Sequence, residues 1–268
     1  MKLFFRKMGQ GPCLMILHGL YGSSDNWLTI AKELSRQYEV FIPDLRNHGR
    51  SPHHPEHTYP AMRDDILELM LDQQIGTCTL IGHSMGGKTA LHVATLAPHK
   101  IDHLIIDDIA PVNYTSLSDY SELAIEHLNI MNALKHTNLD SFTHRSDIEK
   151  EWAGAIPDPN VRRFLLKNIQ RDNDNRFTWR LNVKAVFQNL PHILNGMDQL
   201  GFDSGTQILL PALFIKGERS PYIREDMFPY IHQIFPDVRI VTIPRSGHWV
   251  HAEQPQLFLD SIRHFLDL

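Results

Sequence analysis

The strongest constraint on the fold of this chain is an alternation of short apolar runs with longer amphipathic stretches. The apolar runs have the length and composition of strands that are buried on both faces of a sheet; they are residues 14–17, 40–42, 78–81, 104–106, 212–215 and 238–241. The stretches between them have helical spacing and cover residues 26–36, 60–74, 86–97, 222–235 and 254–267. Strand–helix–strand repeats with right-handed crossovers build a parallel sheet with helices on both faces. The pattern therefore predicts an α/β fold with a mostly parallel, doubly wound sheet.

The alternation stops between residues 113 and 200, where we predict helices and no strand. Apolar residues recur there at helical spacing, over 123–134 and again over 164–169. A chain of 268 residues suits one domain that carries an insertion. We therefore predict an α/β core formed by residues 1–112 and 201–268, and a helical cap formed by residues 113–200.

The composition is that of an ordinary globular protein and excludes some classes of partner. The formal net charge is −5, without the clustered basic face that nucleic acid binding requires. No segment is apolar over the length of a membrane span, and the apolar run near the N-terminus is too short for a signal peptide. Cys13 and Cys78 lie in or beside predicted strands, which favours free thiols in a reducing compartment over a disulfide. We expect a cytoplasmic monomer or homodimer with no nucleic acid partner and no membrane span.

The segment between the strand at 78–81 and the helix at 86–97 is the candidate site of chemistry. Gly82-His83-Ser84-Met85-Gly86 has the G-x-S-x-G spacing, which sets a serine on a sharp turn between a strand and a helix. The turn strains the backbone of the serine, so the residues two positions away on either side must lack bulk. The pattern predicts Ser84 as a nucleophile and the N–H of Met85 as a donor to an oxyanion beside a helix N-terminus.

The same segment also matches the phosphate-binding pattern G-x-x-x-x-G-K-[ST] over Gly82–Thr89. Under this alternative, Lys88 contacts a nucleotide phosphate and Asp107 holds magnesium, as in a nucleotide hydrolase or kinase. A third interpretation treats the segment as a glycine-rich turn without chemistry. The phosphate-binding alternative leaves the motifs described next without a role. We therefore favour the interpretation in which Ser84 is a nucleophile.

Two further motifs have the positions that a serine hydrolase requires. His18-Gly19-Leu20 follows the strand at 14–17, and a tight turn at Gly19 presents the N–H of Leu20 as a second oxyanion donor. Gly247-His248 follows the last predicted strand, where a general base is expected behind the serine in chain order. His251 is a nearby competitor, but the glycine before His248 favours a tight loop there. We assign the base to His248 and a structural role to His251.

The acid that would orient this base has three candidates. The loop after the next-to-last strand has Ser220 at the position where an aspartate is usual, and Glu218 stands two residues before it. Asp107 and Asp108 end the strand that follows the helix at 86–97. Alternation along a strand lets only one of them face the base. We choose Asp108, followed by Asp107 and Glu218.

Two polar segments are assigned no chemistry. Asp44 and Arg46 follow the strand at 40–42, and we expect them to tie neighbouring loops together by hydrogen bonds and charge. His53–His57 has the H-x-x-E-H pattern of zinc peptidases, but Pro52 and Pro55 oppose the helix that such a site needs. We interpret these histidines as solvated loop residues, and we predict no metal and no organic cofactor.

With these motifs, the chain resembles the α/β-hydrolase superfamily and, within it, the YbfF-type acyl esterases. The resemblance covers nearly the whole chain, and the residues that carry it are 18–23, 44–51, 82–88, 108–112 and 247–253. The first three segments occur in many hydrolases, whereas the last two are more typical of this branch. The resemblance implies a catalytic triad of serine, histidine and aspartate, whose aspartate follows the strand after the helix at 86–97. This agrees with the choice of Asp108. The chain departs from the branch at Glu218-Arg219, which keeps Glu218 open as a substitute acid.

Motifs and resemblance together predict a serine hydrolase that cleaves small-molecule esters or thioesters with short to medium acyl chains, acyl-CoA among them. The reaction would pass through an acyl-enzyme on Ser84. Aromatic residues of the cap, with the residue after the base, are predicted to line the acyl pocket; they are Phe142, Trp152, Phe164, Phe187 and Trp249. A non-catalytic ligand-binding protein on the same fold stays an alternative, since fold alone does not decide function.

Overall fold

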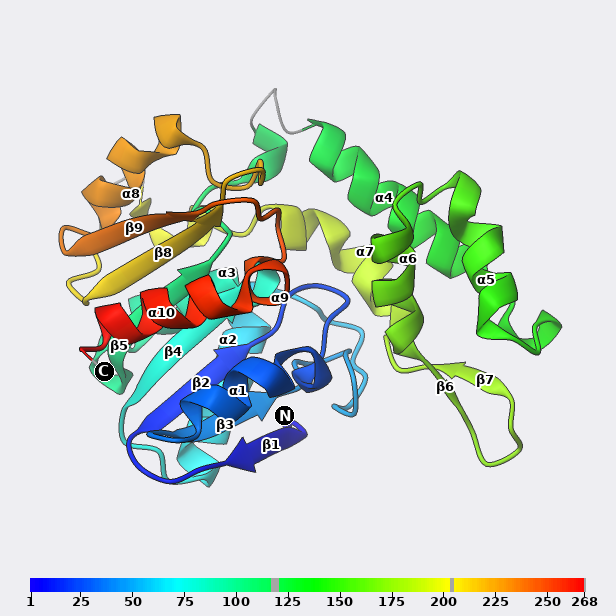
Figure 1. Ribbon diagram of the computed structural model, residues 1–268, viewed down its shortest axis with the longest axis horizontal. Coiled ribbons are helices and arrows are strands. Elements are labelled where there is room, and N and C mark those ends of the chain that lie inside the picture. The colour runs from blue at the N-terminus through cyan, green and yellow to red at the C-terminus, as the bar shows by residue number, and fades with distance from the viewer. Residues whose placement is uncertain (117–120, 203–204, 268) are drawn as a thin grey trace.

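A seven-stranded sheet forms the centre of the computed structural model, which describes residues 1–116, 121–202 and 205–267. Its strands are β1 (Phe5–Met8), β2 (Cys13–Leu17), β3 (Glu39–Pro43), β4 (Cys78–His83), β5 (Ile101–Asp107), β8 (Ala212–Gly217) and β9 (Val238–Ile243). They follow the spatial order β1-β3-β2-β4-β5-β8-β9, and every neighbouring pair except β1 with β3 is parallel (Figure 1). The predicted α/β fold with a mostly parallel sheet is confirmed.

Helices cover both faces of this sheet, which explains why its inner strands are apolar without alternation; the edge strands β1 and β9 are partly exposed. One face carries α1 (Leu28–Leu34), α9 (Val250–Glu253) and α10 (Pro255–Phe265), and the other carries α2 (Tyr59–Asp72), α3 (Met85–Leu96) and α8 (Phe228–Ile234) (Figure 1). Ile16 and Ile81 belong to the core cluster of the first face, whereas their neighbours Met15 and Leu80 belong to that of the second. Successive strand residues point to opposite faces, so both must be apolar.

The strand β1 and the start of α8 differ from the sequence prediction. No strand is predicted at β1, because Phe5-Arg6-Lys7-Met8 carries two cations. It pairs antiparallel with β3 at the edge of the sheet, and an edge strand needs no continuous apolar run. The helix predicted from residue 222 begins only at Phe228, after the short 3-10 helix η10 (Glu225–Met227).

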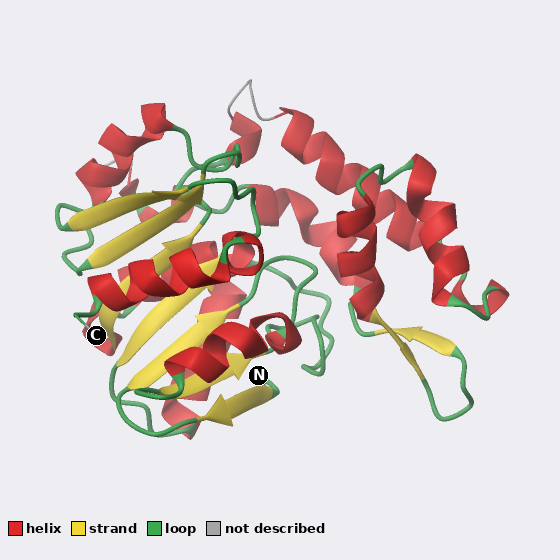
Figure 2. Cartoon of the chain, in the orientation of Figure 1, coloured by secondary structure: helices red, strands yellow, loops and turns green. Residues whose placement is uncertain are grey.

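The segment between β5 and β8 lies beside the main sheet and is mostly helical (Figures 1 and 2). Its helices are α4 (Ser121–His136), α5 (Arg145–Glu151), α6 (Pro159–Leu165) and α7 (Val183–Leu194), and α4 packs against α7. The prediction that this segment contains no strand is wrong: β6 (Ile169–Arg171) and β7 (Phe177–Trp179) form an antiparallel hairpin. Each strand has only 3 residues, too few for an alternating pattern to be recognised. We propose that the cap extends over 113–200 and the core over 1–112 and 201–268.

The structure also bears on the predictions about the two cysteines and about membrane spans. Cys13 is partly buried and Cys78 is buried, and both are free thiols, as predicted. Among the residues that the structure describes, no helix combines the length and the apolar character that crossing a bilayer requires.

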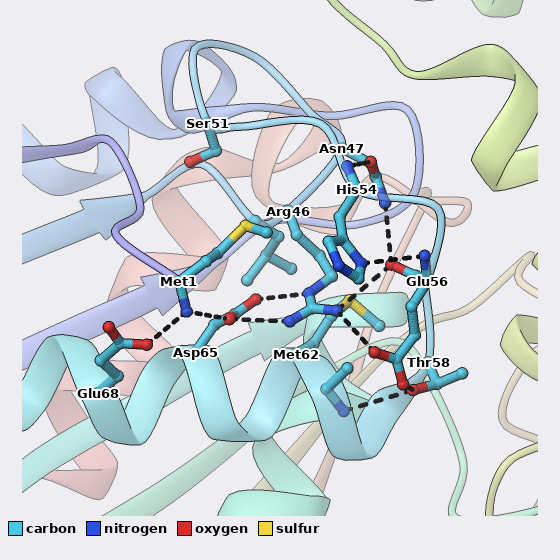
Figure 3. A network of polar contacts seen from close by, with 12 residues as sticks. Met1, Arg46, Asn47, Ser51, His54, Glu56, Thr58, Met62, Asp65 and Glu68 are labelled. Carbon is cyan, nitrogen blue, oxygen red and sulfur yellow. Dashed lines mark hydrogen bonds and ion pairs between the residues drawn. The ribbon is translucent and has the colours of Figure 1, made fainter.

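A buried ion pair fixes the loop after β3 to α2 (Figure 3). Arg46 donates from Nε to one carboxylate oxygen of Asp65 at 2.6 Å and from Nη2 to the other at 2.9 Å. Both side chains are buried. The carboxylate of Asp44 accepts the backbone N–H groups of Ser24 at 2.6 Å and Arg50 at 2.8 Å. Asp44 and Arg46 therefore tie neighbouring loops together, as the sequence predicts.

The histidines of the loop before α2 are not all solvated. His53 and Glu56 are exposed, but His57 is fully buried, with its ring centroid 5.3 Å from that of His48. Burial lowers the pKa of His57 to about 3, so this ring is neutral near pH 7. Prolines and charged residues predict a loop, but they do not predict which of its side chains turns inward.

We expect Asp65→Ala to lower the free energy of unfolding by about 3–5 kcal/mol, because it removes the buried carboxylate that binds the guanidinium of Arg46 at two points and leaves only the exposed Glu56, 3.5 Å from Nη1. Urea denaturation followed by circular dichroism measures the change. The control is Arg36→Ala, which removes an exposed pair with Glu33 at 2.8 Å and should cost less than about 1 kcal/mol. Equal stability of the two variants would show that the ion pair is not structural.

Candidate active site

Ser84 occupies the sharp turn between β4 and α3, and its backbone is strained, as the G-x-S-x-G pattern predicts. Its φ is 52° and its ψ is −119°, a combination that residues with a side chain rarely adopt. A Cβ on Gly82 would lie 2.4 Å from the carbonyl oxygen of Gly86, and a Cβ on Gly86 would lie 2.4 Å from that of Leu17. The close approach of the backbone therefore requires both glycines.

The imidazole of His248 is hydrogen-bonded to Asp108, the acid chosen from the sequence. The distance from Nδ1 to Oδ2 is 2.8 Å, and the Asp108 side chain is fully buried. Two further donors hold this carboxylate: the backbone N–H of Gly217 at 2.9 Å and the hydroxyl of Ser220. Ser220 stands where the sequence suggested an acid, and instead it donates to the acid supplied by the neighbouring strand.

The other two candidate acids have different partners. Glu218 is exposed and accepts the backbone N–H of Arg245 at 2.8 Å. Asp107 is fully buried, with Oδ2 2.8 Å from Nδ1 of His251. The two aspartates therefore face two different histidines. Asp108 lies just beyond β5 with a φ of 53°, so a turn of the backbone, and not alternation along the strand, separates the two side chains.

His83, Asp107 and His251 form a buried group beside His248. Their potential metal-ligating atoms lie within 4.8 Å of one another, the one such group among the described residues. His83 Nε2 donates to the carbonyl oxygen of His248 at 2.9 Å, and His251 stacks on Trp27 with ring centroids 4.0 Å apart. Hydrogen bonds and ring packing account for this arrangement, and we assign no metal to it.

The loop after β2 lies against the serine turn. A Cβ on Gly19 would lie 2.6 Å from Nδ1 of His83 and 3.2 Å from Cβ of Ser84, so only glycine fits there. His18 shapes this loop: its Nδ1 donates to the carbonyl oxygen of Gly19 at 2.9 Å, while its Nε2 accepts the N–H of Leu45 at 2.9 Å. Burial lowers the pKa of His18, which keeps the ring in this neutral form.

Ser84 and His248 line the same cavity of about 200 Å³, between the carboxyl ends of the strands and the cap. Leu20 contributes to its wall from the loop after β2, and α4 and α6 contribute side chains from the cap. Phe164 and Trp249, both predicted to bind substrate, line this cavity, and their ring centroids are 5.4 Å apart. The structure thus brings the predicted nucleophile, base and part of the predicted pocket together.

The other three predicted aromatic residues do not line the Ser84 cavity. Trp152 is buried within the cap, where its Nε1 donates to the hydroxyl of Thr137 at 2.8 Å. Phe187 packs under Lys135, whose Nζ lies 4.3 Å from the ring centroid, at a separate groove of the cap. Phe142 is partly buried against the hydrophobic core. Helical spacing identifies the apolar residues of the cap but not which of them face the core domain.

Sequence reasoning missed several polar residues of the cavity wall, among them His127 of α4 and Tyr222 after β8. His127 lies with Nε2 3.0 Å from the hydroxyl of Tyr222 and Nδ1 3.3 Å from that of Tyr21. The ring of Tyr222 stacks on His248 at 3.9 Å. Burial lowers the pKa of His127 to about 4, so it is neutral near pH 7. In a chain with 17 histidines, no local pattern distinguishes this one.

Lys88, the residue that suggested a phosphate-binding loop, is hydrogen-bonded to backbone carbonyl groups of the cap. Its Nζ donates to the carbonyl oxygens of Leu194 at 3.0 Å and Asn195 at 2.8 Å, where α7 ends. Burial lowers the pKa of this amine to about 7. Lys88 thus satisfies carbonyl groups at a helix C-terminus and joins α3 to the cap.

Known proteins resemble this chain over nearly its full length. The family model for the alpha/beta hydrolase fold matches residues 12–255. The sn-1-specific diacylglycerol lipase ABHD11 of Mus musculus is 35% identical over 259 residues, which cover 95% of this chain and 81% of the lipase. Esterase YbfF of Escherichia coli (strain K12) is 35% identical over 254 residues, which cover 95% of this chain and 92% of the esterase.

A solved structure described as a marine microorganism esterase superimposes with a TM-score of 0.90 at 41% sequence identity. The match covers 98% of this chain and 99% of that one. The family model and this superposition agree with the α/β fold described above. The chain therefore belongs to the α/β-hydrolase family, in the branch that includes esterase YbfF.

Proposed function

We propose that the protein hydrolyses carboxylic esters through an acyl-enzyme on Ser84, with His248 as general base and Asp108 as the acid that orients it. The observation that carries this proposal is the cavity shared by the strained serine and by a histidine whose Nδ1 is hydrogen-bonded to a buried carboxylate. The esterases and lipases among the relatives support ester hydrolysis.

In this mechanism, the Asp108 carboxylate accepts the Nδ1–H of His248 and leaves Nε2 as the basic nitrogen. Nε2 removes the proton of the Ser84 hydroxyl as Oγ attacks the ester carbonyl, and the backbone N–H groups of Leu20 and Met85 stabilise the oxyanion. The imidazolium then returns its proton to the leaving oxygen. Water, deprotonated by the same nitrogen, hydrolyses the acyl-enzyme and regenerates the serine.

The cavities favour small acyl groups and a polar leaving group. The cavity of about 200 Å³ at Ser84 has room for a short to medium acyl chain. A wider cavity of about 720 Å³ shares His248, Phe164 and Trp249 with it. Its charged lining residues are the cations Arg163, Lys167 and Arg219 and the acids Asp158 and Glu253, so the cations are in excess. We include acyl-CoA thioesters among the candidate substrates, because these cations could attract phosphate groups in a protein of net charge −5. The lipase relatives make glyceride esters a further candidate class.

The substrate range is tested with p-nitrophenyl esters and acyl-CoA thioesters of graded chain length. We expect activity to be highest for short and medium acyl groups and to fall by about 10⁴-fold or more in Ser84→Ala, as when a catalytic serine is removed. Ser141→Ala changes an exposed serine of the cap and should retain full activity. Ester hydrolysis that survives in Ser84→Ala would refute the proposed nucleophile.

The acid is tested by comparing Asp108→Asn with Glu218→Gln. Asn at 108 keeps the shape of the side chain but removes the charge that orients and stabilises the imidazolium, so kcat/KM should fall by about 10⁴-fold. Glu218 is exposed and bonded to a backbone N–H, so its variant should lose less than about twofold. Near-normal turnover by Asp108→Asn would transfer the role to Asp107 or Glu218.

Lys88→Ala separates the esterase from a nucleotide hydrolase. We expect ester hydrolysis to change only mildly, while the free energy of unfolding falls by about 1–3 kcal/mol because buried carbonyl groups lose their donor. Neither the wild-type protein nor the variant should release phosphate from ATP or GTP. Phosphate release by the wild-type protein that disappears in Lys88→Ala would support the phosphate-binding alternative instead.

A further inference from the structure

The strand β5 ends at Asp107 and is followed directly by Asp108, and both aspartates are completely buried. A buried carboxyl group is stable as an anion only when donors or cations surround it; otherwise it keeps its proton. Two anions side by side in a protein interior also repel each other. The hydrogen bonds around each carboxyl group therefore indicate which of the two holds the negative charge.

Asp108 has the environment of an anion. Its Oδ1 accepts the backbone N–H of Gly217 at 2.9 Å, and its Oδ2 accepts the hydroxyl of Ser220 and lies 2.8 Å from Nδ1 of His248. These donors come from the end of β8 and from the loop after β9. Several donors aimed at one carboxylate stabilise its charged form.

Asp107 has the environment of a neutral acid. Its Oδ2 has the His251 ring as partner, and its Oδ1 is buried without a hydrogen-bond partner among the described residues. The titratable groups around it are Asp108, the next residue in the chain, His83 on β4, and His248 and His251 after β9. Burial and the charge of Asp108 raise the pKa of Asp107, and burial lowers the pKa of His251 to about 3.

We propose that Asp107 keeps its proton at neutral pH and donates it in a hydrogen bond to Nδ1 of His251. The Asp107–His251 pair then has no net charge, and Asp108 is the anion that acts on His248. Two adjacent carboxyl groups thus have separate tasks because their environments separate their protonation states. The part of the proposal that concerns His248 rests on the proposed function, whereas the protonation of Asp107 does not.

The uncharged Asp107–His251 pair also helps to hold His248 in position through packing contacts. His251 contacts two rings: it stacks on Trp27 at 4.0 Å, and the ring centroid of His83 is 4.8 Å away. His83 in turn donates to the backbone carbonyl of His248. Asp107 is therefore a positioning residue, which acts through His251 and His83 on the backbone of His248. This role requires the hydrogen bond of Asp107 to His251, but it does not require a negative charge on Asp107.

Asp107→Asn and Asp107→Leu test this role through the pH profile of kcat/KM. The amide of Asn can still donate to His251, so we expect activity within about threefold of wild type and an acid limb at the same pH. Leu provides no donor and should lose about tenfold or more. A downward shift of the acid limb in Asp107→Asn would overturn the proposal, because it means that a negative charge next to His248 has been removed. Equal, near-normal activity of both variants would overturn the positioning role.

Infrared spectroscopy of protein labelled with ¹³C in the aspartate carboxyl groups tests the proton itself. At pH 7 we expect an isotope-shifted C=O stretch of a protonated carboxyl group in the wild-type protein. The same band should appear in Ser84→Ala, because this measurement does not depend on catalytic activity. The band should be missing from Asp107→Asn. Carboxylate bands alone in the wild-type spectrum would overturn the proposal, even if neither Asp107 variant folds.

The pH dependence of stability provides an independent measure. Above pH 4 the unfolded chain has lost the Asp107 proton and the native state has kept it, so rising pH destabilises the wild-type protein relative to Asp107→Asn. The Tm of Asp107→Asn minus that of wild type should therefore increase between pH 5 and pH 8. A constant or decreasing difference would contradict a native state that holds this extra proton.

Discussion

The proposed chemistry depends on one hydrogen bond, from Nδ1 of His248 to the buried carboxylate of Asp108. This bond selects the tautomer in which the other ring nitrogen is basic, on a residue that lines the same cavity as Ser84. The bond is available because Asp108 is itself held by Gly217 and Ser220. A carboxylate buried without those donors would take up a proton and could not stabilise an imidazolium.

The parallel sheet is what assembles these groups. Ser84 follows β4, Asp108 follows β5, Ser220 comes soon after β8 and His248 follows β9, and these strands are consecutive neighbours in the sheet. Parallel neighbours end at the same edge, so residues far apart in the sequence meet there without a dedicated loop. The cap then closes the site with α4 and α6, and Lys88 joins the serine helix to the end of α7.

The sequence was sufficient for the fold class, and it placed Ser84, His248 and Asp108 at positions that the structure brings to one site. Ser84 and Asp108 lie directly after the buried strands β4 and β5, and His248 lies on the loop after β9, where glycine spacing is informative. The catalytic roles themselves remain predictions. The cap was harder to predict: Phe164 faces the cavity and Trp152 does not, because tertiary packing decides which face of a cap helix meets the core. His127 and Tyr222 carried no signal, since their positions depend on how the cap sits over the strand ends.

The most direct test of a serine nucleophile is reaction with a fluorophosphonate, followed by intact-mass measurement and peptide mapping. The account predicts one adduct per chain, located on Ser84, and no adduct when His248 is replaced by Ala at the same exposure time. A protein that hydrolyses esters but forms no adduct, or forms it on another residue, would contradict the account.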